Sequence, residues 1–533
     1  MKLSQTKHYL VEYGLIMGDL NTEVTFIDLF SGCGGLSLGL KWAGFKEIAA
    51  IDFDPSAVKV YKANFPENKH VYCEDLRIFT PEELAERIGL NHVDVIVGGP
   101  PCQGFSTVRQ RDGSNTGKRL IEDDRRELYQ EFLKFVSFFK PEIFIIENVP
   151  GIKTTAGGHF FNQLQNEARN LNYRVHSEII KAWEYGVPQK RIRRLIMGTK
   201  VNLRLFTTDL FVEKTHDDSD TSKQKFVSLW EAIGDLPPVP AGGGSDIQQY
   251  DLILREKHIN EYSGRYVIDV LECNKTSHLF DHKARPHNDR DLRDFLRLRE
   301  GENSHQAIMR GEQMEFPYDR NSFKDRFTRQ SKDGLSSTIL AHLSKDGLMF
   351  IHPTQNRSLT VREAARIQSF PDTFMLPVSR TDQFRLIGNA VPPLVGEALG
   401  KGINQWLKLK GRKIDFIDLD AQRESSLLAL KKMVLSSQTE GASGIPQEIF
   451  KDGWRSIHYL FPQLHPISAL ENGDVIIESF YNSPNDPIFD NQLSINAVYK
   501  RSGWPVKLVN IAKEAKRRYD LGDLSEIEFY WGR

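Results

Sequence analysis

Cysteine is scarce in this chain, and its few cysteines are not paired in spacing. Only four occur among 533 residues, namely Cys33, Cys73, Cys102 and Cys273. No two of them stand at the spacing of a zinc site or of a disulfide framework. The sequence therefore predicts neither a structural metal nor a disulfide-stapled secreted fold. A reducing cytoplasm is the expected compartment, and it would keep a reactive cysteine as a free thiol.

Long apolar runs and an excess of one charge are also missing. No stretch has the length and apolar character of a signal core or a membrane span, so no membrane partner is expected. Lys and Arg number 70 against 71 Asp and Glu, a net charge of −1. That balance argues against nucleic-acid binding through a uniformly basic surface. Basic residues are instead concentrated locally, in 109–126, 190–194 and 283–299.

What the chain does contain is a stiff turn that carries a cysteine. Residues 98–106 read Gly-Gly-Pro-Pro-Cys-Gln-Gly-Phe-Ser and follow the apolar stretch 93–97, which is typical of a short buried strand. Two glycines and two prolines make the turn rigid. They hold Cys102 beyond the strand end, where a nucleophile can meet a substrate. A purely structural cysteine would be expected inside the strand, among the valines.

A second glycine-rich turn predicts a cofactor site. It follows the apolar strand 24–30, and its glycines allow a sharp bend and the close approach of a ligand, although the dinucleotide-binding spacing is absent. The next strand ends at Asp52 and Phe53, where an acid can hold a ribose and a ring can lie against adenine. Asp75, after a third strand, suits an adenine amino group. These residues favour an adenosine-containing cofactor across the strand ends of a parallel sheet; turn-capping acids are the alternative.

Two further segments place polar residues near strand ends. Glu147 directly follows the apolar residues 144–146, a costly position for a carboxylate without a partner, although an ion-paired or capping acid would look the same. Gln189, Arg191 and Arg193 alternate along an extended segment and are expected to project to one side. Such a row suits phosphates or a base carbonyl, whereas a solvated basic face is the plainer interpretation.

Taken together, these motifs resemble the DNA (cytosine-5)-methyltransferase family of the prokaryotic or phage restriction-modification type. The resemblance covers roughly Val24 to Leu407 and implies a Rossmann-like α/β domain that uses S-adenosylmethionine. It also implies an inserted target-recognition domain and a flipped-out target base. Six motifs occur in the family's order: FIDLFSGCGG (26–35), GGPPCQGFS (98–106), ENV (147–149), QKRIRR (189–194), REAARIQSFP (362–371) and QFRLIGNAVPP (383–393).

The resemblance implies a role for each catalytic residue. The thiolate of Cys102 would add to carbon 6 of cytosine, and Glu147 would hydrogen-bond ring nitrogen 3 and the exocyclic amine. Arg193 would bind the cytosine carbonyl oxygen. Arg191 would act beside it in the same catalytic group, and Gln189 would help to order the neighbouring segment and the DNA phosphates.

The segment after the nucleophile is expected to contact DNA. Residues 107–119 are polar, basic and glycine-containing, a composition that suits a mobile loop closing over the substrate, although an ordinary solvated connector is the alternative. The residues expected to touch DNA there are Ser106, Arg109 and Arg111.

The cofactor residues follow from the resemblance in the same way. Phe30 would pack on the adenine and Phe53 would stack on it, while Asp52 would bind the ribose hydroxyls and Asp75 the adenine amine. Asn389 would close the pocket near the methionine end. Members of the family usually carry glutamate where Asp52 stands, so its shorter side chain implies a small adjustment. The full set implied for the cofactor is Phe30, Gly32, Gly34, Asp52, Phe53, Asp75 and Asn389.

The resemblance and the composition together divide the chain into six expected regions. The interval assigned to target recognition is polar, rich in glycine and proline, and expected to be mostly strand and loop; its His278, His282 and His287 lack the further ligand that a zinc site needs. The C-terminal module is expected to bind DNA or a partner, with a purely structural extension as the alternative, and a nuclease is not favoured. The regions are an N-terminal extension (1–22), the first catalytic part (23–204), the target-recognition domain (205–344), the catalytic return (345–435), a linker (436–446) and a small α/β module (447–533).

The sequence thus predicts a monomeric, sequence-specific DNA (cytosine-5-)-methyltransferase that acts on double-stranded DNA. It would convert S-adenosylmethionine to S-adenosylhomocysteine without a metal, alone or beside a separate cognate restriction endonuclease. An RNA cytosine-5 methyltransferase is one alternative, but the Cys-Phe-Thr signature of that branch is absent. A catalytically silent DNA-binding protein is the other, and it would not need Cys102, Glu147 and Arg193 together. The recognition sequence does not follow from these residues.

Overall fold

The computed structural model describes most of the first 411 residues. The described ranges are 23–101, 128–153, 158–200, 210, 212–262, 265–316, 327–345 and 347–411, with Leu428, Lys432, Leu435 and Ser436 beyond them. Cys102, Ser106, Arg109 and Arg111 therefore lie outside the described residues. So do the expected N-terminal extension, the linker and the C-terminal module.

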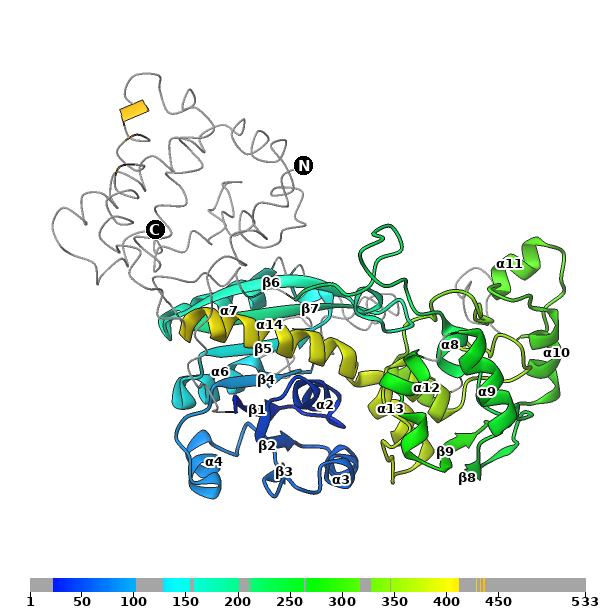
Figure 1. The fold of residues 1–533 in the computed structure, drawn as a ribbon, viewed down its shortest axis with the longest axis horizontal. Coiled ribbons are helices and arrows are strands. Elements are labelled where there is room, and N and C mark those ends of the chain that lie inside the picture. The colour runs from blue at the N-terminus through cyan, green and yellow to red at the C-terminus, as the bar shows by residue number, and fades with distance from the viewer. Residues whose placement is uncertain are drawn as a thin grey trace.

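A seven-stranded sheet forms the centre of the molecule (Figure 1), in the order β3-β2-β1-β4-β5-β7-β6. Its first five strands along the chain are parallel, whereas β7 is antiparallel to both β5 and β6. β6 therefore runs in the same direction as the first five strands, and β7 is the one strand of this sheet that departs from the expected parallel arrangement. The strands are β1 (Thr25–Leu29), β2 (Lys46–Asp52), β3 (Val71–Cys73), β4 (Val95–Gly98), β5 (Ile143–Asn148), β6 (Tyr173–Lys181) and β7 (Ile192–Lys200).

Helices cover both faces of this sheet, and that is why its central strands are almost continuously apolar. One face packs against α2 (Gly35–Trp42) and α14 (Pro393–Gly411), which Figure 1 shows lying across the strands. These two helices approach so closely that a Cβ on Gly39 would stand 2.2 Å from the carbonyl oxygen of Pro393. The opposite face packs against α4 (Pro81–Ile88), α6 (Leu128–Phe139) and α7 (His159–Asn170).

The inserted segment between β7 and the return to the sheet is richer in helices than expected, so the prediction of a mostly strand-and-loop region was wrong. Its only named strands among the described residues are β8 (Gly244–Gln249) and β9 (His278–Lys283), which pair antiparallel. Each helix is too short to leave a periodic apolar signal, but each begins at a polar residue whose side chain caps it. The helices are α8 (Leu229–Ile233), α9 (Leu252–Glu261), α10 (Asp289–Arg297) and α11 (Ser304–Met309), with a π-helical turn over Tyr266–Val270 and a 3-10 turn over Cys273–Lys275.

The insertion has two parts that pack differently. Its inner part shares one apolar cluster with α3 (Pro55–Asn64), α12 (Val361–Ile367) and α13 (Arg380–Asn389). Its outer part has a cluster of its own, in which Phe295 and Phe327 pack with Leu348 and Ile351. The boundary expected at residue 344 falls inside this outer cluster.

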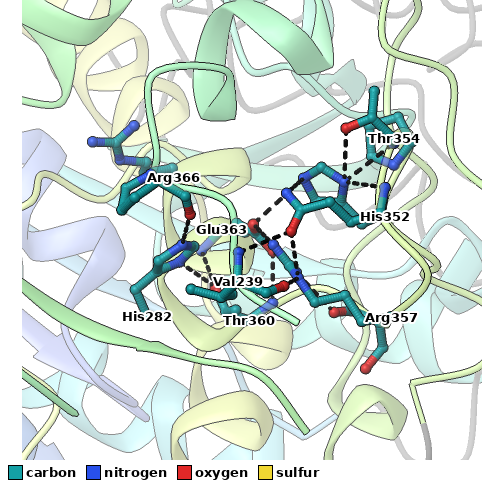
Figure 2. Close-up of polar contacts among 12 residues, drawn as sticks. Val239, His282, His352, Thr354, Arg357, Thr360, Glu363 and Arg366 are labelled. Atoms are coloured by element: carbon teal, nitrogen blue, oxygen red, sulfur yellow. Dashed lines mark hydrogen bonds and ion pairs between the residues drawn. The ribbon is translucent and has the colours of Figure 1, made fainter. Parts of the chain in front are cut away.

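A buried polar network joins the inner insertion to the first turn of α12 (Figure 2). Arg357 donates two hydrogen bonds to the carboxylate of Glu363, at 2.8 and 2.7 Å, and a third to the carbonyl oxygen of Val239 at 2.9 Å. Glu363 also accepts the backbone N–H of Thr360 at 2.7 Å, which completes a capping box. His352 Nε2 lies 3.6 Å from the same carboxylate.

The next turn of α12 carries a second buried pair. Arg366 binds the carboxylate of Asp235, from the insertion, and that of Asp372, at 2.8 Å from its Nε. Tyr250 donates to Asp372 at 2.6 Å. All of these groups lie in the interior. The return helix is therefore held to the insertion by ionised side chains rather than by apolar packing alone.

Among the residues that the structure describes, no helix has both the length and the apolar character needed to cross a bilayer.

The network predicts an acid-sensitive stability. Burial lowers the pKa of His352 from 6.5 to about 3, so between these values the unfolded chain binds a proton that the folded chain does not. The free energy of unfolding should therefore fall as the pH drops, by about 2 kcal/mol between pH 7 and pH 5 from this residue alone. Urea denaturation at both pH values should show that His352→Gln removes this part of the loss.

His278 provides the control, because it is exposed on β9. His278→Gln should leave the pH dependence as it is in the unaltered protein. An unchanged pH dependence in His352→Gln would contradict the role given to the buried imidazole.

Candidate active site

The turn that leads to Cys102 docks on the end of the neighbouring strand β5. A Cβ on Gly98 would stand 2.1 Å from the carbonyl oxygen of Leu29, so only glycine fits where β4 passes β1. A Cβ on Gly99 would lie 3.6 Å from Glu147 Oε2. Asn148 Nδ2 donates to the carbonyl oxygen of Pro100 at 3.3 Å. These contacts place the described start of the turn, through Pro101, directly beside Glu147.

The structure brings Glu147 and Arg193 together. Arg193 Nε lies 3.0 Å from Glu147 Oε1, and the two side chains are 18% and 11% exposed. Oε1 is buried and has no hydrogen-bond donor of good geometry among the described residues. The carboxylate thus has an ion-pair partner, while its Oε1 makes no hydrogen bond of good geometry among the described residues.

Strand register explains why these two side chains meet. Glu147 pairs with Leu195 across β5 and β7, so Glu147 and Arg193 lie on the same face of the sheet as the cluster that contains Ile145 and Leu195. Arg194 points to the opposite face and donates to Ser177 Oγ at 3.0 Å. Neighbouring arginines of the basic run 190–194 therefore extend to opposite faces of the sheet.

Gln189 and Arg191 occupy a different environment from Arg193. Gln189 is fully buried; its amide nitrogen donates to Gln368 Oε1 at 2.6 Å, and its amide oxygen accepts from Ile339 N–H at 3.0 Å. Both the nitrogen and the oxygen of the Gln189 amide are therefore already hydrogen-bonded inside the protein. A direct contact of Gln189 with DNA does not fit this geometry.

Arg191 is likewise buried, beneath the segment that returns to the sheet. Its guanidinium donates to the carbonyl oxygens of Ile339 at 3.0 Å, Gly388 at 3.2 Å and Ala390 at 2.8 Å. Since it is 1% exposed, it holds backbone rather than facing solvent. Arg191 therefore ties the start of β7 to residue 339 and to residues 388–390.

The glycine turn after β1 has the shape that a ligand site requires. Phe30 has a φ of 59°, an uncommon conformation for a residue with a side chain, and it ends the strand at the turn. A Cβ built on Gly32 would meet nothing within 4 Å, so this backbone faces open space. The N–H of Gly32 donates to Asp52 Oδ2 at 2.8 Å, and Phe53 beside it is 65% exposed. An open glycine, an acid and an exposed ring fit an adenosine ligand.

Asp52 is the acid of this group, and its surroundings fix its orientation. Its Oδ1 accepts the N–H of Asp54 at 2.9 Å while its Oδ2 accepts that of Gly32. Burial raises the pKa of Asp52, and the two backbone hydrogen bonds oppose that rise. The shorter side chain thus reaches the glycine turn directly.

Gly34 and Asn389, two other expected cofactor residues, lie in different environments. Gly34 packs against the rings of Tyr61 and Phe65, so a side chain at this position would clash with them. Its φ of 90° is also a conformation that favours glycine. Asn389 is exposed at the end of α13, and the next turn of chain reaches the site, because a Cβ on Gly35 would stand 2.2 Å from the carbonyl oxygen of Val391.

Asp75 is engaged with another side chain. Arg77 Nε donates to both of its oxygens, at 3.0 and 3.1 Å, and these hydrogen bonds lower the pKa of Asp75. The pair is partly exposed, with side-chain exposures of 57% for Arg77 and 31% for Asp75. A ligand that used Asp75 would have to share it with Arg77.

The described cysteines and histidines offer no competing site. The Cys33 thiol is buried, and burial raises its pKa to about 12, so it is a poor nucleophile. His282 contacts the Thr360 hydroxyl at 3.0 Å and the Pro237 carbonyl at 2.9 Å, while His287 contacts Ser358. Within the described ranges, no three potential ligands gather as a metal site would require.

Two residues of the site had no role in the sequence interpretation. Asn148 anchors the cysteine-bearing turn, and its place in the 147–149 motif was the available signal. Arg385, on α13, binds Asp54 beside the glycine turn. That pair joins residues far apart in the chain, so no local pattern could reveal it.

Comparison with known proteins gives one family. Residues 24–405 match the family described as C-5 cytosine-specific DNA methylase. The Type II methyltransferase M.DdeI of Desulfomicrobium norvegicum is 34% identical over 72% of this chain and 89% of its own length. M.AgeI of Thalassovita gelatinovora is 32% identical over 71% of this chain and 98% of its own length. A crystal structure of a prophage-encoded E. coli protein described as a DNA modification methyltransferase has a TM-score of 0.57 at 27% identity, over 72% of this chain and all of that one.

The environment of Arg191 predicts a structural cost for its loss. Arg191→Met should lower the free energy of unfolding by about 3 kcal/mol, because buried carbonyl oxygens lose a charged donor. Lys190→Met is the matched control, since Lys190 is the exposed neighbour in the same run, and it should change stability little. Urea denaturation of the two variants distinguishes them; equal losses would contradict the role assigned to the buried guanidinium.

Proposed function

The chain belongs to the C-5 cytosine-specific DNA methylase family, and from that premise we propose how its own residues carry out the reaction. It is a sequence-specific DNA (cytosine-5-)-methyltransferase with S-adenosylmethionine as methyl donor. The observation that carries the residue assignment is the pairing of Glu147 with Arg193 beside the turn that leads to Cys102.

Cys102 is proposed as the nucleophile. Its thiolate adds to carbon 6 of the target cytosine, and the electrons of the 5,6 double bond then make carbon 5 nucleophilic. When bound, S-adenosylmethionine supplies an electrophilic methyl group on its sulfonium. Once carbon 5 carries the methyl group, a base removes its remaining proton, the double bond forms again and the Cys102 thiolate leaves.

Glu147 and Arg193 are proposed to hold the base during this addition. Glu147 lies beside Gly99, where its carboxyl group would accept the cytosine amine and hold a proton at ring nitrogen 3. Arg193, within 3.0 Å of that carboxylate, can donate to the carbonyl oxygen of the base. The two groups thereby stabilise the charge that develops when the thiolate adds.

The open glycine turn is proposed to hold the methyl donor, which leaves as S-adenosylhomocysteine. Asp52 would bind the ribose hydroxyls and Phe30 and Phe53 the adenine, next to the unobstructed backbone of Gly32. Asp75 would bind the adenine amine while paired with Arg77, and Asn389 would close the methionine end.

Arg191 and Gln189 are proposed as positioning residues rather than as contacts of the substrate. Their side chains bind the return segment, so they fix the strand that carries Arg193. Ser106, Arg109 and Arg111 remain proposed DNA contacts.

The wider organisation is proposed on the same basis. Residues 23–204 and 345–435 would form the catalytic domain around the target-recognition interval 205–344, and 447–533 would form a further module. The protein would act as a cytoplasmic monomer on duplex DNA, alone or with a separately acting endonuclease.

The direct test of the reaction uses an unmethylated bacterial genome. Incubation with S-adenosylmethionine followed by bisulfite sequencing should show protected cytosines in one short sequence context. Cys102→Ala should abolish that protection and leave DNA binding intact. Residual methylation in the variant would contradict the nucleophile assignment, and equal methyl incorporation into purified tRNA would favour the RNA alternative.

The Glu147 assignment has its own test. Glu147→Gln should lower kcat at least roughly 100-fold, because proton placement and charge stabilisation at the base are both lost. The KM for S-adenosylmethionine should stay the same. Glu142→Gln, just before the start of the same strand, serves as the control and should retain activity. A loss confined to cofactor affinity would contradict the placement of Glu147 at the base.

A further inference from the structure

Arg385 links two segments of the chain that lie 331 residues apart. It extends from α13, and one of its terminal nitrogens binds the carboxylate of Asp54 while the other donates to Asp382 Oδ1 at 2.7 Å. Asp54 is the N-cap of α3, since its Oδ1 accepts the N–H of Ser56 at 2.9 Å. The guanidinium is therefore fixed between the starts of two helices.

Asp54 is also part of the turn that carries the proposed cofactor residues. Its backbone N–H donates to Asp52 Oδ1 at 2.9 Å, and the other oxygen of Asp52 accepts Gly32 N–H. Phe53, with its exposed ring, stands between the two acids. A shift of Asp54 would therefore move the acid and the ring together.

The rest of α13 reaches the other side of the same site. Arg385 and Asn389 are four residues apart on this helix and so lie on one face of it. The end of the helix is fixed as well, because Arg191 binds the carbonyl oxygens of Gly388 and Ala390. α13 is thus held at two points, with Asn389 between them and the open turn nearby.

Charge adds a second reason for the contact. Asp52, Asp54 and Asp382 bring three carboxylates to this corner, and repulsion between them would spread the turn. Arg385 is the cation that faces Asp54 and Asp382 within the described part of the chain. The Arg385 side chain is 35% exposed, so solvent partly screens its ion pairs. Arg385 therefore affects the positions of the segments it joins more than the stability of the fold.

We propose that Arg385 is a positioning residue for the S-adenosylmethionine site. By fixing the 52–54 turn against α13, it sets the spacing between the ribose acid Asp52 and Asn389, which would contact opposite ends of one ligand. The inference rests on the proposed cofactor residues and adds to them a residue that touches neither the ligand nor the target base.

Cofactor affinity and turnover separate this role from a general loss of structure. Arg385→Met should raise both the Kd and the KM for S-adenosylmethionine roughly five-fold. The value of kcat at saturating cofactor and the KM for DNA should not change. Arg385→Lys keeps the charge and should recover part of the affinity. Arg380→Met, at the exposed start of the same helix, is the matched control and should bind cofactor normally.

A reciprocal variant tests the same contact without altering α13. Asp54→Asn retains a good helix cap and removes only the charge that Arg385 binds, so it should weaken cofactor binding in the same direction. The effects of Arg385→Met and Asp54→Asn should not add in the double variant. If Arg385→Met does not fold, the Asp54→Asn protein still measures the contact by equilibrium binding of S-adenosylmethionine.

Each outcome has a defined meaning. Asp52→Ala is measured first; if it leaves the cofactor Kd unchanged, the proposed cofactor site is wrong. If Asp52→Ala weakens binding but Arg385→Met and Asp54→Asn do not, only the positioning role is overturned. Additive losses, or equal losses in kcat and cofactor affinity, would also overturn it, because they indicate general destabilisation.

Discussion

Arginine and carboxylate side chains are buried together where α12 meets the inserted segment, and the joining of the catalytic body to its insertion depends on them. A buried charge that loses its partner destabilises a protein far more than a paired one stabilises it. Arg366 has one partner in the insertion, Asp235, and another, Asp372, just beyond its own helix. Arg357 binds Glu363 and, through Val239, the insertion backbone. The return helix therefore has a satisfied interior only when the insertion is folded against it.

Arginines elsewhere solve a related problem by binding backbone. Arg191 binds carbonyl oxygens of two segments, at residue 339 and at 388–390, and Arg329 binds those of Leu298, His352 and Phe295. A guanidinium suits this task because its donors are rigid and remain charged at all ordinary pH values. Irregular chain near the site can thus be buried without leaving its carbonyl groups unpaired.

The sequence predicts the parts of the fold that are apolar and local. β1, β4 and β5 are short buried runs that coincide closely with the apolar stretches 24–30, 93–97 and 144–146. β6 was missed because buried polar side chains, such as Arg174 and Glu178, interrupt its apolar pattern. The insertion was judged by periodicity, which helices of one to three turns cannot show. Its capping residues were the better local signal.

In the candidate site, too, the local features follow from the sequence, whereas the contacts between distant segments do not. That Glu147 needed a partner follows from the cost of burying a carboxylate, and the structure supplies Arg193. The alternation of Gln189, Arg191 and Arg193 is real, but periodicity does not say whether a side faces a ligand or the protein interior. Only the chain packed against β7 decides that, and it buries the first two residues under Gln368 and Gly388. The partner of Asp54, Arg385, is likewise a matter of tertiary placement. The partner of Asp75 is Arg77, only two residues away, so that contact is local.

The two-part packing of the insertion bears on which part of it can be replaced by the corresponding segment of a relative. The outer part has its own apolar cluster, and a hydrogen bond from Ser304 N–H to the carbonyl oxygen of Phe327, at 2.8 Å, lies within it. The inner part shares ion pairs and core with α12, so a foreign sequence there would have to supply matching partners for Arg366 and Arg357. Swaps between relatives are therefore tolerated best at the outer part, where a crossover disturbs no buried charge of α12.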